Sequence, residues 1–189
     1  MEPSTLMKIE ADVVIEADAA LVEAAHRDPA AFTALYRRYV TPVYRYLYKW
    51  VGNPAEAEDL TSQVFIDVLE GLIHYQEQGH FAAWLFTIAR RKTIAAHRRR
   101  RPNLSLDEIE DMPTLTEEPF ECVVKSEQRD RMAAIFARLN EDQRELLRLR
   151  FTAGLRYADI GVVLGRSEAS VKMAIYRILR QMIEKWSEE

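Results

Sequence analysis

The run from Phe81 to Arg101, FAAWLFTIARRKTIAAHRRRR, begins with aromatic side chains and ends in a block of arginines. It holds seven lysine or arginine residues and no aspartate or glutamate. Guanidinium and ammonium groups bind phosphate oxygens, and aromatic rings stack on unpaired bases, so these residue types together are typical of a surface that holds a nucleic acid strand. Because like charges repel one another, the uncompensated positive charge itself indicates an anionic partner.

A second group of polar residues lies ahead of this run, on a predicted amphipathic helix. The apolar residues that recur three and four positions apart there are Leu60, Val64, Phe65, Val68, Leu69 and Leu72. Asp59 and Gln63 lie on the opposite, solvent side of the helix, with Glu58 and Ser62 beside them. Outward-facing carboxylates and amides favour a basic protein partner and repel DNA.

A third group surrounds the turn at Gly165 and Arg166. The pattern predicts a helix from Tyr157 to Leu164 and a second helix capped by Ser167. Two helices across so tight a turn form the helix-turn-helix layout, whose second helix enters the major groove of DNA. The leading or outward positions of the second helix are Ser167, Glu168, Ser170, Lys172, Met173, Tyr176 and Arg177. The residues placed to grip phosphates are Arg144, Arg148 and Arg166.

Patterns that would support catalysis or metal binding are missing from the sequence. The four histidines are scattered, with no spacing that would pair two of them on one metal ion. The single cysteine, Cys122, lies among acidic residues, which disfavour the reactive thiolate. The six glycines form no loop that could cradle a phosphate. The sequence therefore predicts a protein that is not an enzyme and that needs no cofactor and no metal.

The elements that position these residues are predicted to be helices, so the expected fold class is all-α. Asp28 followed by Pro29 predicts a helix start, and Gly52-Asn53-Pro54 predicts its end. Pro42 is expected to kink or restart this helix. Its buried stripe is predicted to be Phe32, Leu35, Tyr36 and Tyr39.

Helical pattern is interrupted over residues 102–128, which contain three prolines, eight acidic residues and one lysine. This composition predicts an acidic flexible linker. Beyond it, Asn140 and Gln143 predict a capping box for a helix that runs through Phe151 and breaks at Gly154. The apolar positions expected in this part are Met132, Ile135, Phe136, Leu139, Leu146, Leu147 and Phe151.

The chain is therefore expected to form two small helical domains. We predict an N-terminal extension over residues 1–17, a first domain over 18–101, the linker over 102–128 and a second domain over 129–189. One cysteine is consistent with a reducing compartment, and no apolar run approaches the roughly 18 residues of a membrane span. The N-terminal residues do not read as a secretion signal. We expect a cytoplasmic protein without a membrane span.

Three motifs in this order resemble a known family. They are AEDLTSQVF, then FAAWLFTIARR with its basic tail, then LNEDQRELLRLRFTAGLRYADIGVVLGRSEASVK. Together with DPAAFTALYRRYVTPVYRYL ahead of them, they resemble the group IV, or extracytoplasmic-function (ECF), sigma factors of bacterial RNA polymerase. The resemblance covers about three quarters of the chain. It implies a sigma region 2 bundle for the first domain and a sigma region 4 helix-turn-helix for the second.

The resemblance implies partners and site residues as well. The implied partners are core RNA polymerase and promoter DNA. The polymerase would be bound through its beta-prime clamp helices and its beta flap, and the DNA both as a duplex and as a melted single strand. An anti-sigma factor is a further candidate partner. The residues implied to bind core polymerase are Glu58, Asp59, Ser62 and Gln63. Those implied to bind the minus-ten element are His80, Phe81, Trp84, Arg90, Arg91, Lys92, Arg98, Arg99, Arg100 and Arg101. The second domain, with the ten residues named above, is implied to bind the minus-thirty-five element.

Two other classes of protein stay open at this stage. A helix-turn-helix regulator that binds operator DNA as a dimer would leave the acidic helix and the arginine block of the first domain unexplained. A sigma-like decoy that sequesters an inhibitor would have no use for the cationic run from Arg90 to Arg101. We therefore expect a promoter-specificity subunit that assists promoter melting.

Overall fold

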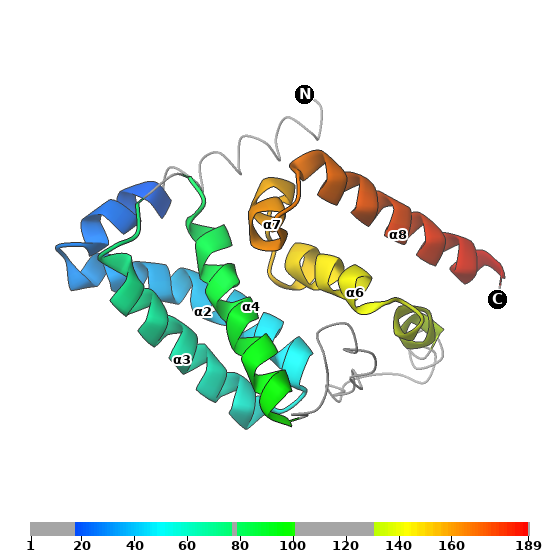
Figure 1. Cartoon of the computed structure of the whole chain (residues 1–189), viewed down its shortest axis with the longest axis horizontal. Helices are drawn as coiled ribbons and strands as arrows, with labels where there is room; N and C mark the ends of the chain where they lie inside the picture. Colours follow the sequence, from blue (N-terminus) through cyan, green and yellow to red (C-terminus); the bar gives the residue numbers. More distant parts are fainter. Residues whose placement is uncertain (1–17, 77–78, 101–130, 189) are drawn as a thin grey trace.

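The computed structural model describes residues 18–76, 79–100 and 131–188, and all regular elements in these ranges are helices (Figure 1). The all-α fold class is therefore confirmed for the described residues. The predicted N-terminal extension, the whole of the predicted linker and Arg101 lie outside them. In the described ranges no helix has the length and apolarity that a membrane span requires.

The first helix covers residues 18–25 and leads through a turn into α2 (Pro29–Val51). As predicted, the side chain of Asp28 caps α2 by accepting a hydrogen bond from the backbone N–H of Ala30 at 2.8 Å, with Pro29 in the first turn. The helix ends at Gly52, which adopts a left-handed conformation with φ of 68°. Pro42 lies inside the helix, which is a single element throughout.

The helix α3 (Pro54–Leu72) starts immediately after this turn. The side chain of Asn53 accepts a hydrogen bond from the backbone N–H of Glu56 at 3.1 Å, and Pro54 occupies the first turn. Its buried residues are Ala57, Leu60, Thr61, Val64, Phe65, Val68 and Leu72. The prediction of a buried Leu69 was wrong, since its side chain is 56% exposed. Tyr36 of α2 was also wrongly predicted to be buried, because it lies at the edge of the stripe and is 41% exposed.

The helix α4 (Phe81–Arg100) completes what we call the front bundle, residues 18–100, which contains the first helix, α2, α3 and α4 (Figure 1). Phe86 of α4 is fully buried and meets the ring of Tyr46 from α2 edge to face, with 5.5 Å between the ring centroids. Two of the other helices, α2 and α3, pack against α4. The cationic half of α4 is thus anchored by an apolar first half.

The rear bundle, residues 131–188, contains a short helix over 131–137 followed by α6 (Glu141–Leu147), the π-helical segment η2 (Arg148–Thr152), α7 (Tyr157–Leu164) and α8 (Glu168–Glu188). The predicted capping box of α6 is present, with reciprocal hydrogen bonds of 2.9 and 3.0 Å between Asn140 and Gln143. Gly154 ends the segment with φ of 74°. Phe151 is 61% exposed although it continues the apolar period, because the wider π-helical turn moves it off the buried face.

The helix-turn-helix is formed by α7 and α8. Gly165 ends α7 in a left-handed conformation with φ of 66°, and Ser167 accepts a hydrogen bond from the backbone N–H of Ser170 at 3.2 Å. The buried face of α8 includes Val171, Ile175 and Ile178. The predicted turn and cap are confirmed.

Replacing Gly161 with alanine is expected to destabilise the rear bundle. A Cβ atom on this residue would lie 2.6 Å from the carbonyl oxygen of Arg166, which is backbone and cannot rotate away. Forcing the turn apart is expected to cost about 1–3 kcal/mol, as overpacked sites do. Urea unfolding followed by circular dichroism should show a lower midpoint than for the wild-type chain. Gly71→Ala serves as the control, since its Cβ would lie 3.0 Å from a side chain, the ring of Trp84, and not 2.6 Å from a backbone oxygen, and an equal shift in both variants would contradict the explanation.

The front and rear bundles pack directly on each other (Figure 1). The contact is made by α4 against α7 and by α2 against η2. The apolar cores of the two bundles form one continuous cluster in this arrangement. Polar side chains from both bundles also meet at the contact, and they include several residues that the sequence assigns to DNA binding.

Candidate nucleic-acid interface

The basic residues of α4 divide into two sets. Arg91, Arg98 and Arg99 are exposed and point away from the core. In contrast, Lys92 pairs with Asp67 of α3, with 2.7 Å between its Nζ and the Oδ2 of the carboxylate. Arg90 faces the rear bundle, and its Nε lies 3.4 Å from Oε1 of Glu145. The side chain of Arg100 and all of Arg101 lie outside the described part of the chain.

The aromatic residues at the start of α4 pack inward. Phe81 is 3% exposed and lies 5.6 Å from the ring of Tyr39 and 5.8 Å from that of Tyr75, measured between centroids. Trp84 is half-buried and stacks on Tyr75, with 4.5 Å between the centroids. In this structure Phe81 is therefore a core residue that offers no face to a base, because rings at helical spacing bury themselves against neighbouring helices.

The loop before α4 is tied to the rear bundle. The Nδ1 of His80 lies 3.2 Å from Oδ1 of Asp159, which is 2% exposed. Arg156 holds the same carboxylate with bonds of 2.6 and 2.8 Å, and it also donates to the carbonyl oxygen of Gly79 at 3.2 Å. His80, a predicted minus-ten residue, is thus paired with a carboxylate in this arrangement.

Two arginines predicted to grip phosphates lie in the interior of the protein instead. Arg144 is 6% exposed and donates to the carbonyl oxygen of Ala137 at 2.7 Å. Arg148 is 4% exposed, pairs with Glu141 and lies over the ring of Trp50, with 4.5 Å between its guanidinium carbon and the ring centroid. Both guanidinium groups are enclosed in this structure by the helices packed around α6, and the predicted role of these two residues in gripping phosphates stays a prediction.

The remaining residues predicted for the second DNA-binding surface are all exposed. Met173 and Tyr176 are 59% and 53% exposed on α8. The other exposed members of the set are Arg166, Ser167, Glu168, Ser170, Lys172 and Arg177. The leading end and outer face of α8 are therefore free to approach a groove, and the roles of these residues stay a prediction.

The outer side of α3 is more apolar than its sequence pattern predicts. Glu58, Asp59, Ser62 and Gln63 are exposed there, as expected. Beyond them, one side of the helix continues into an exposed apolar stripe that the sequence analysis missed: Ile66, Leu69 and Ile73 are 55%, 56% and 73% exposed. Large exposed apolar groups next to polar ones are typical of a protein-binding surface.

The contact between the bundles has a buried carboxylate at its centre, which the sequence analysis also missed. Glu145 of α6 is 4% exposed and accepts hydrogen bonds from the hydroxyl of Tyr46 at 2.7 Å and from Nε1 of Trp50 at 3.0 Å. Burial raises the pKa of this carboxyl, and the Tyr46 hydroxyl and the nearby guanidinium groups of Arg148 and Arg90 only partly oppose that effect. The sequence shows only a glutamate between Arg144 and Leu146, which does not by itself indicate this contact.

Raising the pH is therefore expected to loosen the packing of the two bundles. With a pKa above its ordinary value of 4.5, Glu145 binds a proton in the packed arrangement that it releases when the bundles separate. The stabilisation that the Glu145 carboxyl gives to the packed arrangement is complete when the pH is below the ordinary pKa of this group. It is lost as the pH rises through the raised pKa. The titratable or charged groups that face it are Tyr46, Arg90, Arg148 and Glu141. Small-angle X-ray scattering should show the radius of gyration increasing over this range.

The variant Glu145→Gln supplies the control for this titration. An amide can keep hydrogen bonds to the Tyr46 hydroxyl and the Trp50 N–H but has no proton to release. Its radius should be insensitive to pH between 4.5 and neutrality. The same pH dependence in wild type and variant would show that another group is responsible.

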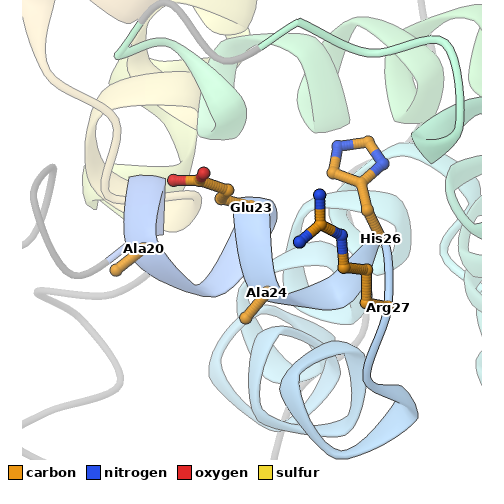
Figure 2. Close-up of a pocket in the computed structure, with 5 residues that line it drawn as sticks. All are labelled: Ala20, Glu23, Ala24, His26 and Arg27. Atoms are coloured by element: carbon orange, nitrogen blue, oxygen red, sulfur yellow. The ribbon is translucent and has the colours of Figure 1, made fainter.

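Other places in the described residues offer little chemistry. A surface hollow is lined by Ala20, Glu23, Ala24, His26 and Arg27, all from the first helix and the turn that follows it (Figure 2). Among the described residues, no other element lines this hollow, so it is open on the side away from that segment. Among the described residues, no group of three histidine, cysteine, aspartate or glutamate side chains could hold a metal ion.

The two bundles match two parts of one protein family. Residues 35–102 match Sigma-70 region 2, and residues 129–182 match Sigma-70, region 4. The structure is also similar to that of CnrH in complex with the cytosolic domain of CnrY. The TM-score is 0.65 with 21% sequence identity, over 92% of this chain and 99% of that one, which supports the fold.

Individual relatives of the chain are ECF RNA polymerase sigma factors. The ECF RNA polymerase sigma factor ShbA of Streptomyces griseus is 33% identical over 131 residues, which cover 66% of this chain and 69% of the relative. The ECF RNA polymerase sigma factor BldN of Streptomyces coelicolor is 38% identical over 167 residues, which cover 86% of this chain. The match spans 63% of the length of BldN.

Proposed function

Because the chain belongs to the ECF RNA polymerase sigma factors, we propose that it binds core RNA polymerase, directs it to specific promoters and assists promoter melting. The observation that carries this proposal is the presence of both family regions in order, the first with exposed basic residues on α4 and the second with an exposed helix-turn-helix. Under this proposal the chain acts inside the cell and supplies no catalysis of its own.

The two faces of the front bundle suit different partners. The acidic and amide groups of α3, followed by the apolar stripe of Ile66, Leu69 and Ile73, form a surface for the clamp helices of the polymerase beta-prime subunit. The exposed guanidinium groups of α4 would bind the phosphates of the minus-ten region. A division of this kind keeps DNA away from the protein-binding face, because carboxylates repel phosphates.

The rear bundle would bind the minus-thirty-five element through α8, and contact with the beta flap is proposed with it. An anti-sigma factor stays among the proposed partners, since CnrH was solved in complex with a second protein, CnrY. The domain boundaries predicted from the sequence, at residues 18, 101, 128 and 129, are likewise part of the proposal. The matched ranges of 35–102 and 129–182 support the proposed division between the two domains.

The proposal is tested by mixing the purified chain with core RNA polymerase and a promoter library. Run-off transcripts that start at a shared promoter sequence are the expected result. Binding to DNA without polymerase, and no transcripts with it, would instead identify a helix-turn-helix regulator. Absence of both activities would contradict any role at promoters.

The double variant Lys172→Ala and Arg177→Ala is expected to reduce transcription from promoters that depend on the minus-thirty-five element by about thirtyfold or more. Both side chains are exposed on α8, and each base or phosphate contact in a groove is worth about 1–3 kcal/mol. Run-off transcription from promoters with and without that element measures the effect. A matched control, Arg180→Ala with Lys185→Ala, removes two exposed charges further along the same helix. Equal loss on both promoter types would contradict the assignment.

A further inference from the structure

Three hydrogen-bond donors of the front bundle converge on one carboxylate of the rear bundle. The hydroxyl of Tyr46 and Nε1 of Trp50 lie 2.7 and 3.0 Å from the two oxygens of Glu145, and Nε of Arg90 lies 3.4 Å from the first of these. Tyr46 and Trp50 come from α2 and Arg90 comes from α4. The three donors therefore belong to the front bundle, and the acceptor belongs to the rear bundle.

The donor set has the composition of an anion site. An indole N–H and a guanidinium group can only donate, and a tyrosine hydroxyl donates readily. Tyr46 is 0% exposed and Trp50 is 5% exposed, so in the packed arrangement their polar atoms have no access to water. When the bundles separate, Glu145 leaves, and the donors then need another acceptor or water, because unpaired polar groups are unfavourable.

We propose that Tyr46, Trp50 and Arg90 form a binding site for a backbone phosphate of nucleic acid, and that Glu145 fills this site when the two bundles are packed. The inference deepens the proposed function and rests on it. Arg90 lies on α4 with the exposed Arg91, Arg98 and Arg99, so a strand that follows these residues passes the site. A phosphate offers two free oxygens in the same way as the carboxylate that it replaces.

A second contact follows the same principle. Asp159 of the rear bundle faces His80, which precedes the same helix of the front bundle. Two groups predicted to meet the minus-ten DNA, His80 and Arg90, are thus both paired with carboxylates of the rear bundle. DNA binding by the front bundle and packing of the two bundles would compete for the same side chains.

Replacement of the Glu145 carboxylate by a phosphate at this site is energetically accessible. Burial raises the pKa of Glu145, so the ionised carboxylate is less stable at the contact than in water. Arg148, which covers the ring of Trp50, belongs to the rear bundle and departs with it. Separation also opens the site to solvent, and a phosphate there would not have to be fully dehydrated.

The test measures binding of the full chain to a short fluorescent single-stranded DNA by anisotropy, over a series of salt concentrations. Glu145→Ala is expected to bind the strand about tenfold more tightly than wild type, because the competing carboxylate is gone. Glu145→Lys should show the same gain, since an ammonium group cannot be seated against Arg90. Glu184→Ala is the matched control, because it removes one exposed acidic charge from the same bundle. It should change the affinity by less than about twofold.

Second substitutions then locate the phosphate. In the Glu145→Ala background, Arg90→Gln and Trp50→Phe should each remove most of the gain, and Arg90→Gln should lower the slope of log affinity against log salt by about 0.7. Unchanged binding in both Glu145 variants, or a gain that survives both second substitutions, would overturn the inference. Run-off transcription by the wild-type chain is unaffected by that result, so the proposed function would still stand.

Discussion

Replacing Asp59 with arginine and Gln63 with alanine is expected to reduce the affinity for core RNA polymerase about a hundredfold. Both side chains are exposed on α3, in line with the apolar stripe that ends at Ile73, so the double variant changes the charge of the proposed clamp-binding face without touching the core. A hundredfold change corresponds to about 2.8 kcal/mol, which lies within the range of about 2–4 kcal/mol for one interface anchor. Titration of labelled polymerase with each protein measures the change.

The control for this variant carries the same chemical change elsewhere. Glu23→Arg with Gln181→Ala reverses one acidic charge and removes one amide, both at exposed positions. Circular dichroism should show the same helix content in the wild type and both double variants. Polymerase affinity that stays at the wild-type value in the Asp59 variant would remove α3 from the proposed interface.

Replacing all four arginines from Arg98 to Arg101 with glutamine is expected to reduce open-complex formation about a hundredfold or more at moderate salt. Each phosphate contact on a single strand contributes about 0.7 to the slope of log affinity against log salt, so four lost contacts should lower the slope by about 3. The exposed Arg98 and Arg99 contribute no packing that the change would disturb. Permanganate footprinting across a salt series measures the melted fraction.

Removing the same number of charges elsewhere separates this local effect from net charge. Arg27, Arg37, Arg180 and Lys185 are exposed on other elements and can be changed to glutamine together. For that variant, the slope of log affinity against log salt should stay close to the wild-type slope. If both quadruple variants lose equally, the arginine block acts only through the overall charge of the protein.

The local features of the fold could be predicted from the sequence because each depends on a few neighbouring residues. Asp28 with Pro29, Asn140 with Gln143, and the turn at Gly165 all adopt the predicted cap or turn. A cap needs only a side-chain acceptor and a free N–H two or three residues later, and both are visible in the sequence. These predictions were confirmed.

Predictions that depend on distant packing were less successful. Helical spacing shows which residues lie on one face but not how far a neighbouring helix covers the edges of that face, which is why Tyr36 and Leu69 were misplaced. Arg148 is enclosed partly by Trp50 of the other bundle. Glu145 finds its partners 95 and 99 residues earlier in the chain, and no local pattern encodes such a pair.

The candidate site divides in the same way. The exposed positions of α3 and α8 follow from helix geometry, and the sequence placed them correctly on the surface. Their roles stay predictions, since partner contacts are not encoded in exposure. Phe81 shows the limit most clearly, because an aromatic residue beside a basic run has the same sequence pattern whether it stacks on a base or packs in a core.

The π-helical segment that follows α6 absorbs one extra residue of the chain. Its wider turn, closed by the backbone N–H of Ala153 bonding to the carbonyl of Arg148 at 2.9 Å, accommodates one residue more than a regular turn. Deleting one residue there would close the segment as an ordinary α-helical turn and would leave the residues beyond it in nearly the same register. A deletion inside α6 itself would instead rotate everything beyond it by about 100° relative to what precedes it, so the π-helical segment is the place in this part of the chain where the loss of one residue would be tolerated best.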